Sequence, residues 1–144
     1  MRRKARRQKV YEKYGGRCAY CGTKIEYKDM QVDHLIPQRL FTAYDLTKDY
    51  SQEWFKKEFF AKSLDKDDPS NLMPSCRSCN HYKGAEPLKA FRYWMNTIHE
   101  RIEKIYIVRV ALRYGIVKLC PFDGEFYFEK FKNNDNGGDE KDTE

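Results

Sequence analysis

Apolar residues recur at helical spacing along the longest patterned stretch of the chain, residues 88–112. They are Leu88, Phe91, Trp94 or Met95, Ile98, Ile102, Ile105, Val108, Ala111 and Leu112. Such spacing predicts helix with one apolar face, and this face drifts between Asn96 and Glu103. We therefore predict two helices rather than one, with Pro87 in the first turn, Gly115 as the C-terminal cap and the apolar stripe in the core.

Shorter patterns predict the remaining elements. A basic stretch with a single apolar stripe predicts a helix over residues 1–16, ended by the glycine pair at its end. Loose alternation over residues 24–33 predicts a short strand pair. Residues 116–119 and 125–128 predict the two strands of a hairpin, and residues 51–64 again have helical spacing.

The composition favours a polyanionic partner. The net charge is +6, the isoelectric point is near 9.0 and 35% of residues are charged. Nucleic acid comes first among such partners and an anionic membrane second, while an inert basic surface is the alternative. No apolar run approaches the roughly 18 residues that span a bilayer, and the basic N-terminus lacks the apolar region of a secretory signal. We therefore expect a cytoplasmic protein without a membrane partner.

Two Cys-x-x-Cys units give the strongest metal signal in the chain. Cys18 and Cys21 form the first unit, and Cys76 and Cys79 form the second. Two such turns can supply four thiolates to one tetrahedral Zn²⁺, and a four-sulfur site of this kind is structural. A redox dithiol is the weaker alternative, because both units would have to be redox-active. The fifth cysteine, Cys120, is expected to be a buried or partly buried free thiol.

Three polar signals lie beside these units. They are the pair Asp33-His34, the single Asn71, and the pair Asn80-His81. Each is weak when taken alone. A lone histidine is more often structural than catalytic, Asn71 could be a turn residue or a helix cap, and Asn80 could be an N-cap.

Taken together, these signals resemble a known family. Val-Asp-His-Leu-Ile-Pro follows the first cysteine unit, Asn-Leu precedes the second, and Cys-Asn-His-Tyr-Lys-Gly closes it. Over residues 17–83, this arrangement resembles the HNH nucleases, also called ββα-metal or His-Me finger nucleases. The resemblance is to the zinc-stapled type found in bacteria and phages. The resemblance implies an α+β fold with a small ββα-metal core and a four-cysteine zinc site, joined here by the predicted flanking helices and C-terminal β-hairpin. It also implies a metal-dependent DNA endonuclease that hydrolyses phosphodiester bonds, leaving 5′-phosphate and 3′-hydroxyl ends.

The resemblance also implies a role for each motif residue. His34 would be the general base, and Asp33 before it would be a ligand of the catalytic metal ion. Asn71 would hold the loop and the histidine in register. Asn80 would be the last metal ligand, and we favour it over the neighbouring His81. A carboxylate and an amide oxygen form a hard donor set that suits Mg²⁺ or Mn²⁺.

On this interpretation, residues 1–132 form a single nuclease domain and residues 133–144 form a disordered acidic tail. Within the domain we expect the basic helix, a zinc and ββα core over residues 17–84, and helices with a hairpin over residues 85–132. Residues 38–70 form an insert relative to many family members. Its aromatic residues could form a small satellite core, or could shape substrate choice or a protein contact. They are Phe41, Tyr44, Trp54, Phe55, Phe59 and Phe60.

Three basic residues near the cysteine units, Arg17, Arg77 and Lys83, are predicted to grip the phosphate backbone, with solvated charges as the alternative. DNA is the expected substrate and RNA the alternative. One active site cuts one strand, so a monomer should nick, and a homodimer or repeated nicking is needed for a double-strand break. Two other functions stay open: a non-catalytic zinc-knuckle module that binds nucleic acid, and a nuclease subunit active only with a phage packaging or restriction partner.

Overall fold

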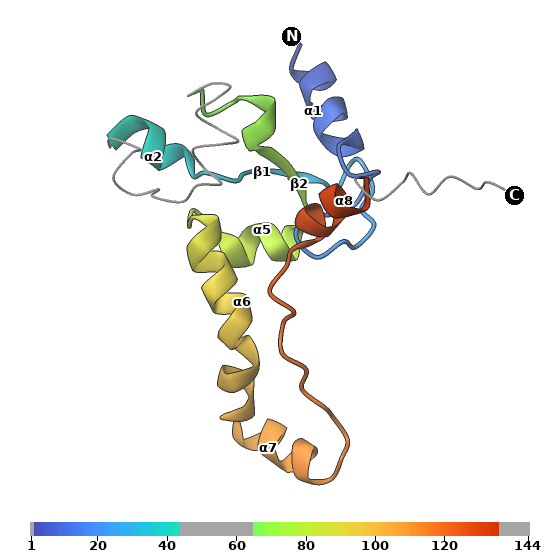
Figure 1. The fold of residues 1–144 in the computed structure, drawn as a ribbon, viewed down its shortest axis with the longest axis vertical. Coiled ribbons are helices and arrows are strands. Elements are labelled where there is room, and N and C mark those ends of the chain that lie inside the picture. The colour runs from blue at the N-terminus through green and yellow to red at the C-terminus, as the bar shows by residue number, and fades with distance from the viewer. Residues whose placement is uncertain (1, 44–64, 136–144) are drawn as a thin grey trace, which may run out of the picture. The chain divides into compact units, whose positions relative to one another are not determined.

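A computed structural model of the chain describes residues 2–43 and 65–135, and it combines helices with one small sheet (Figure 1). The elements are α1 (Arg3–Glu12), β1 (Gln31–His34), α2 (Gln38–Ala43), the 3-10 turn η2 (Pro69–Asn71), β2 (Leu72–Ser75), α5 (Arg77–Lys83), α6 (Leu88–Glu103), α7 (Tyr106–Arg113) and α8 (Tyr127–Asp135). The mixed α+β composition expected from the sequence is therefore present. The expected helix at 51–64 and most of the insert's aromatic residues lie outside the described residues.

The chain divides into two units. The first contains the described residues up to Pro87 together with those from Phe126 onward, and the second contains residues 88–125. The sheet and helices α1, α2, α5 and α8 belong to the first unit, whereas α6 and α7 belong to the second.

Strands β1 and β2 pair antiparallel, with Gln31 opposite Ser75 and His34 opposite Leu72. The sequence prediction of a strand pair within residues 24–33 was therefore wrong. Lys24 forms only an isolated bridge with Arg17. All four residues of β2 are buried, so β1 pairs with a strand from the interior of this unit. The helix α5 follows β2 after one residue, which gives the order strand, strand, helix.

Helix α1 is held against the sheet by a small core. Val10, Met30 and Leu72 are buried together there, with Tyr11 and other half-buried residues packed around them. The helix ends at Glu12, four residues before the predicted end, and the glycine pair follows it with positive φ angles of 63° and 73°. A Cβ on Gly16 would lie 2.9 Å from the Tyr11 hydroxyl, so a larger residue would disturb this packing.

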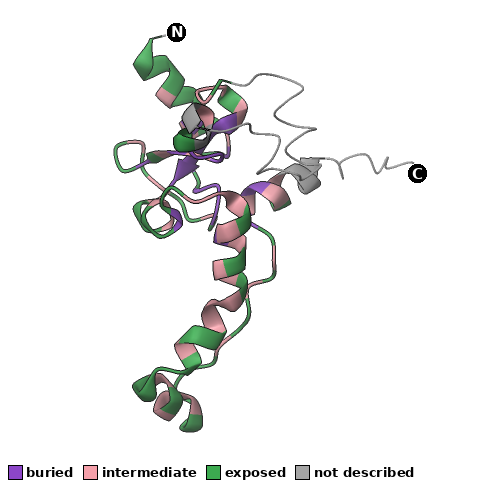
Figure 2. Cartoon of the chain, turned by 90° about the vertical axis from the view of Figure 1, so that its left-hand side faces the viewer, coloured by how far each residue is buried: buried purple, intermediate pink, exposed green. Residues whose placement is uncertain are grey.

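The second unit confirms the predicted break into two helices. Helix α6 ends at Glu103 and α7 begins at Tyr106, and Gly115 follows α7 with φ of 70°. The predicted stripe is only partly core. Phe91 is buried, but Ile105 is 52% exposed because it lies in the connection between the helices. Figure 2 shows buried residues gathered in the first unit, around the sheet.

The predicted C-terminal hairpin is absent from the described residues. Residues 116–126 contain no strand, and α8 begins at Tyr127. The alternation that suggested a strand has another cause. Phe126 and Phe128 are both buried and each packs edge-on against Tyr20, while the amide of Phe128 donates to the Ala19 carbonyl at 2.8 Å. The segment therefore docks on the first cysteine unit.

Cys120 and the end of α8 differ from the sequence-based expectations. Cys120 is exposed, not buried, because it lies in an extended segment without regular structure. Helix α8 runs through Asp135, so residues 133–135 of the predicted disordered tail are helical. Among the described residues, no helix is both long enough and apolar enough to cross a membrane.

Candidate functional site

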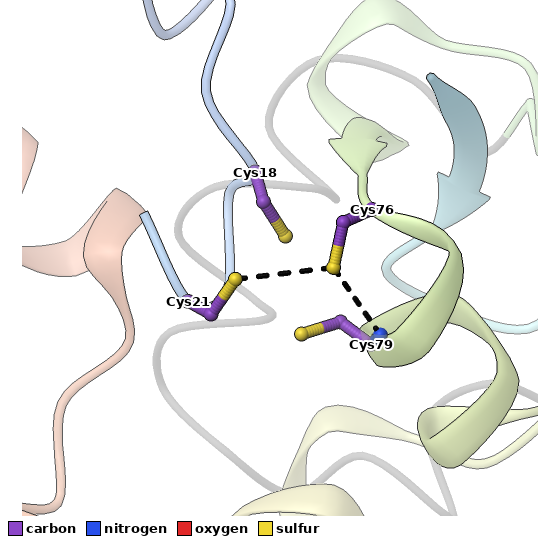
Figure 3. Close-up of side chains that lie close together, drawn as sticks. All are labelled: Cys18, Cys21, Cys76 and Cys79. Carbon is purple, nitrogen blue, oxygen red and sulfur yellow. Dashed lines mark hydrogen bonds between the residues drawn. The ribbon is translucent and has the colours of Figure 1, made fainter. Parts of the chain in front are cut away.

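The four cysteines of the two Cys-x-x-Cys units meet at one point (Figure 3). Their sulfur atoms all lie within 4.8 Å of one another, and the Sγ atoms of Cys21 and Cys76 are 3.9 Å apart. Four sulfurs at about 2.3 Å from a central zinc ion would be roughly 3.8 Å apart. The donor set and its spacing therefore fit one tetrahedral metal ion.

Local backbone structure presents each pair of sulfurs. In the first unit, the Gly22 amide donates to the Cys18 carbonyl at 2.9 Å and closes a tight turn. Gly22 has φ of 74°, and a Cβ there would lie 2.8 Å from the Tyr127 ring. In the second unit, Cys76 caps α5, and its sulfur accepts from the Cys79 amide at 3.4 Å. The turn in the first unit and the helix cap in the second are both local structures that the Cys-x-x-Cys spacing favours.

Neighbouring cysteines in this cluster shift one another's pKa values. Hydrogen bonding from Cys18 and Cys79 lowers the pKa of Cys21 far below its usual value. The hydrogen bonds with Cys18 and Cys21 raise the pKa of Cys79 far above it. Cys21 therefore becomes a thiolate most readily, and thiolates are the metal-binding form of cysteine.

A second site lies where β1 ends. Asp33 and His34 from β1 and Asn80 from α5 line one hollow of about 320 Å³, together with Arg39 and Gly84. The strand, strand, helix order brings the end of β1 and the helix after β2 to the same place. The structure thus gathers three of the four residues predicted to do the chemistry.

Asp33 is buried and already has cationic and hydroxyl partners. Its Oδ2 accepts a hydrogen bond from the Tyr20 hydroxyl and lies 2.9 Å from the ammonium of Lys83. That ammonium also donates to the His34 carbonyl at 3.1 Å. Lys83 is 1% exposed, so the prediction that it grips a nucleic-acid backbone was wrong. It belongs to the interior of the site, because the carboxylate of Asp33 compensates its charge.

Asn71, the fourth predicted residue, holds the backbone that follows His34. Its Oδ1 accepts from the Ile36 amide at 2.7 Å, and its Nδ2 donates to the carbonyls of Ile36 at 3.2 Å and Lys66 at 2.9 Å. The Leu35 amide donates to the Asn71 carbonyl at 2.9 Å. A buried asparagine with every polar side-chain atom bonded fixes this loop.

The imidazole of His34 has a partner at each nitrogen. Its Nε2 lies 3.1 Å from Asp67 Oδ1, and its Nδ1 lies 3.2 Å from the side-chain amide of Gln38. The side chain is 15% exposed. His34 therefore faces the hollow from a fixed orientation.

A curated relative is known. Over 103 residues the chain is 28% identical to the "SPbeta prophage-derived putative HNH endonuclease YoqL" of Bacillus subtilis (strain 168). The aligned part covers 72% of this chain and 37% of the relative, so the chain spans well under half of that protein's length. No family model matches the chain, and no solved structure matches it.

Sequence reasoning missed several residues around His34. Arg3 and Arg6 of α1 line a second hollow of about 250 Å³ together with His34 and Asp67. The basic composition of the N-terminal stretch was visible in the sequence, but which arginines face His34 depends on how α1 packs. Asp67 lies in the insert, where no local pattern distinguished it from neighbouring acids.

The predicted backbone contacts Arg17 and Arg77 lie elsewhere. Both side chains are exposed and neither lines the two hollows. Arg17 donates to the Gly22 carbonyl at 2.9 Å beside the first cysteine unit, and Arg77 is the first residue of α5. The structure leaves their contact with nucleic acid as a prediction.

Proposed function

We propose that this chain is a metal-dependent endonuclease of the HNH type, with β1, β2 and α5 as its ββα-metal core and the four-cysteine cluster as its structural zinc site. The observation that carries the proposal is the convergence of Asp33, His34 and Asn80 on one hollow. The relative's name, which describes an HNH endonuclease, supports the same activity.

In this proposal each residue has a defined task. Asp33, through the carboxylate oxygen not bonded to Lys83, and Asn80, through its amide oxygen, would hold Mg²⁺ or Mn²⁺, since hard oxygen donors suit these ions. The bound ion would stabilise the charge that develops on the scissile phosphate. His34 takes a proton from the attacking water, because an imidazole can accept one at neutral pH. Asn71 holds the loop after His34.

We take DNA as the proposed substrate. The chain carries a net charge of +6, and the arginine-lined hollow places Arg3 and Arg6 on the α1 side of His34. A phosphate backbone that enters there would continue past His34 toward Asn80, and cationic side chains of this kind position the backbone without reading its sequence. One such site cuts one strand, so we expect nicking by a monomer.

The decisive experiment follows nicking of supercoiled plasmid with Mg²⁺, with Mn²⁺ and without an added ion. We expect ion-dependent nicking by the native chain and a loss of about 10²- to 10⁴-fold in His34→Ala, the range that a general base contributes. His81→Ala is the matched control, because His81 is exposed and adjacent to Asn80. DNA affinity should be the same in all three proteins. Equal nicking by the native chain and His34→Ala would defeat the proposal.

One observation favours the rival function, a non-catalytic module that binds nucleic acid. Asp33 is neutralised by Lys83, as a purely structural carboxylate would be. Under the rival, the native protein binds plasmid but cuts it with neither ion, and replacing Asn80 with Ala leaves binding of Mn²⁺ unchanged. Under the nuclease proposal, Asn80→Ala weakens Mn²⁺ binding and nicking together.

A further inference from the structure

The side chains around His34 form a chain of hydrogen bonds that fixes which nitrogen carries its proton. The ammonium of Lys66 donates to Gln38 Oε1 at 3.3 Å. The other end of that amide, Nε2, must then be the group facing His34 Nδ1 at 3.2 Å, and an amide nitrogen can only donate. His34 Nδ1 therefore accepts, and its Nε2 donates to Asp67 Oδ1 at 3.1 Å.

Asp67 is itself held in place. Its second oxygen lies 3.5 Å from the Arg6 guanidinium of α1, and its backbone amide donates to Asp65 Oδ1 at 3.0 Å. The hydrogen bond from His34, together with the charges of Arg6 and Lys66, lowers the pKa of Asp67 below its usual 3.8. At neutral pH it is therefore a carboxylate, which accepts hydrogen bonds and does not donate them.

We propose that Asp67, from the insert, is the positioning residue of His34, and that Nδ1 is the atom that receives the proton. This inference rests on the proposed nuclease function. As the water oxygen forms its bond to phosphorus and the bond to the 3′-oxygen breaks, the water proton moves to Nδ1 and solvent water protonates the 3′-oxygen. The proton on Nε2 stays between His34 and Asp67, whose negative charge stabilises the imidazolium. The Gln38 amide occupies the position of the attacking water and must move aside when substrate binds.

The test compares Asp67→Asn and Asp67→Glu with the native chain. In Asp67→Asn we expect kcat for nicking to fall about 10- to 100-fold, less than loss of the base itself, and KM to change less than kcat, because Asp67 acts on His34 and not on the reacting phosphate. Asp67→Glu should recover most of kcat, since it restores a carboxylate. Asp29→Asn, an exposed acid in the same unit, is the matched control. An unchanged kcat in Asp67→Asn, or a loss carried by KM alone, would overturn the proposal.

A second readout needs no enzymatic activity. The chain has three histidines, so nitrogen NMR of the imidazoles can be assigned with His81 and His99 variants. At about pH 8, where imidazoles are mostly neutral, the native protein should show His34 protonated on Nε2. In Asp67→Asn the Gln38 amide still donates to Nδ1, so the tautomer should stay, but the Nε2 and Hε2 resonances should shift because the charged acceptor is gone. Protonation on Nδ1 in the native protein, or identical Nε2 resonances in both proteins, would overturn the role of Asp67. An inactive native protein with the expected shift of the Nε2 resonances would instead overturn the nuclease function alone.

Discussion

The ammonium of Lys83 lies 2.9 Å from the carboxylate of Asp33, and the lysine side chain has no exposure to solvent. A fully buried lysine keeps its charge only beside an anion. The pair joins the last turn of α5 to the end of β1, so it links the two elements from which the proposed metal ligands come.

Breaking this pair should destabilise the fold strongly. We expect Lys83→Met to lower the free energy of unfolding by about 3–5 kcal/mol, because it leaves a buried carboxylate without its counter-charge. Urea unfolding with saturating zinc measures this, and Lys28→Met is the control because Lys28 is exposed and its ion pair with Glu26 lies at the surface. Adding Asp33→Asn to Lys83→Met should recover part of the loss. A change below about 1 kcal/mol would show that the pair carries little stability.

Removal of zinc should unfold the first unit. Zinc binding contributes on the order of 10 kcal/mol to folding in small zinc modules, and the sheet depends on the first cysteine unit through the bond from the Ala19 amide to the Pro74 carbonyl. We expect one zinc ion per chain by elemental analysis, retained in Cys120→Ser and lost in Cys79→Ser. Chelator should reduce the circular dichroism signal of the native chain by the part that the first unit contributes. A metal-free protein with an unchanged spectrum would contradict the zinc assignment.

Asn71 should act through both ends of its amide. Asn71→Ala removes three hydrogen bonds and leaves the buried Ile36 amide unpaired, which should cost about 1–3 kcal/mol. Asn71→Asp keeps the acceptor but turns a carboxylate oxygen toward two carbonyls, so we expect an equal or larger loss at neutral pH. Thermal unfolding of both variants beside Asn96→Ala, an exposed position, checks this. A native-like Asn71→Asp would show that the donor half is dispensable.

Tyr20 should make the fold sensitive to alkali. Its burial and the negative charge of Asp33 raise the pKa of Tyr20 well above 10. Above about pH 10 the unfolded chain releases this proton while the folded chain keeps it, so stability falls as pH rises. Between about pH 9 and 11, without added Mg²⁺, Tyr20→Phe should lose less stability than the native chain. Tyr93 is 66% exposed in the native protein, so the stability of Tyr93→Phe should fall with rising pH as steeply as that of the native chain. An equally steep decline in Tyr20→Phe would contradict this origin.

The sequence by itself determined the features that depend on neighbouring residues. The Cys-x-x-Cys spacing predicted two sulfur-bearing turns, and the structure brings them together. The drifting apolar face predicted the break between α6 and α7. The motif resemblance pointed to Asp33, His34 and Asn80, which do line one hollow.

Tertiary structure decided the features that depend on distant partners. Residues 31–34 pair with a strand some forty positions along the chain rather than with their neighbours, since that strand offers a buried surface. Lys83 became a buried ion-pair partner only because α5 packs beside Asp33, and Asp67 reached His34 only because η2 and β2 return the chain to β1. Hydrogen bonds and ion pairs between distant segments depend on how those segments are buried and oriented in the folded chain. The local spacing of residues in the sequence encodes neither their burial nor their orientation.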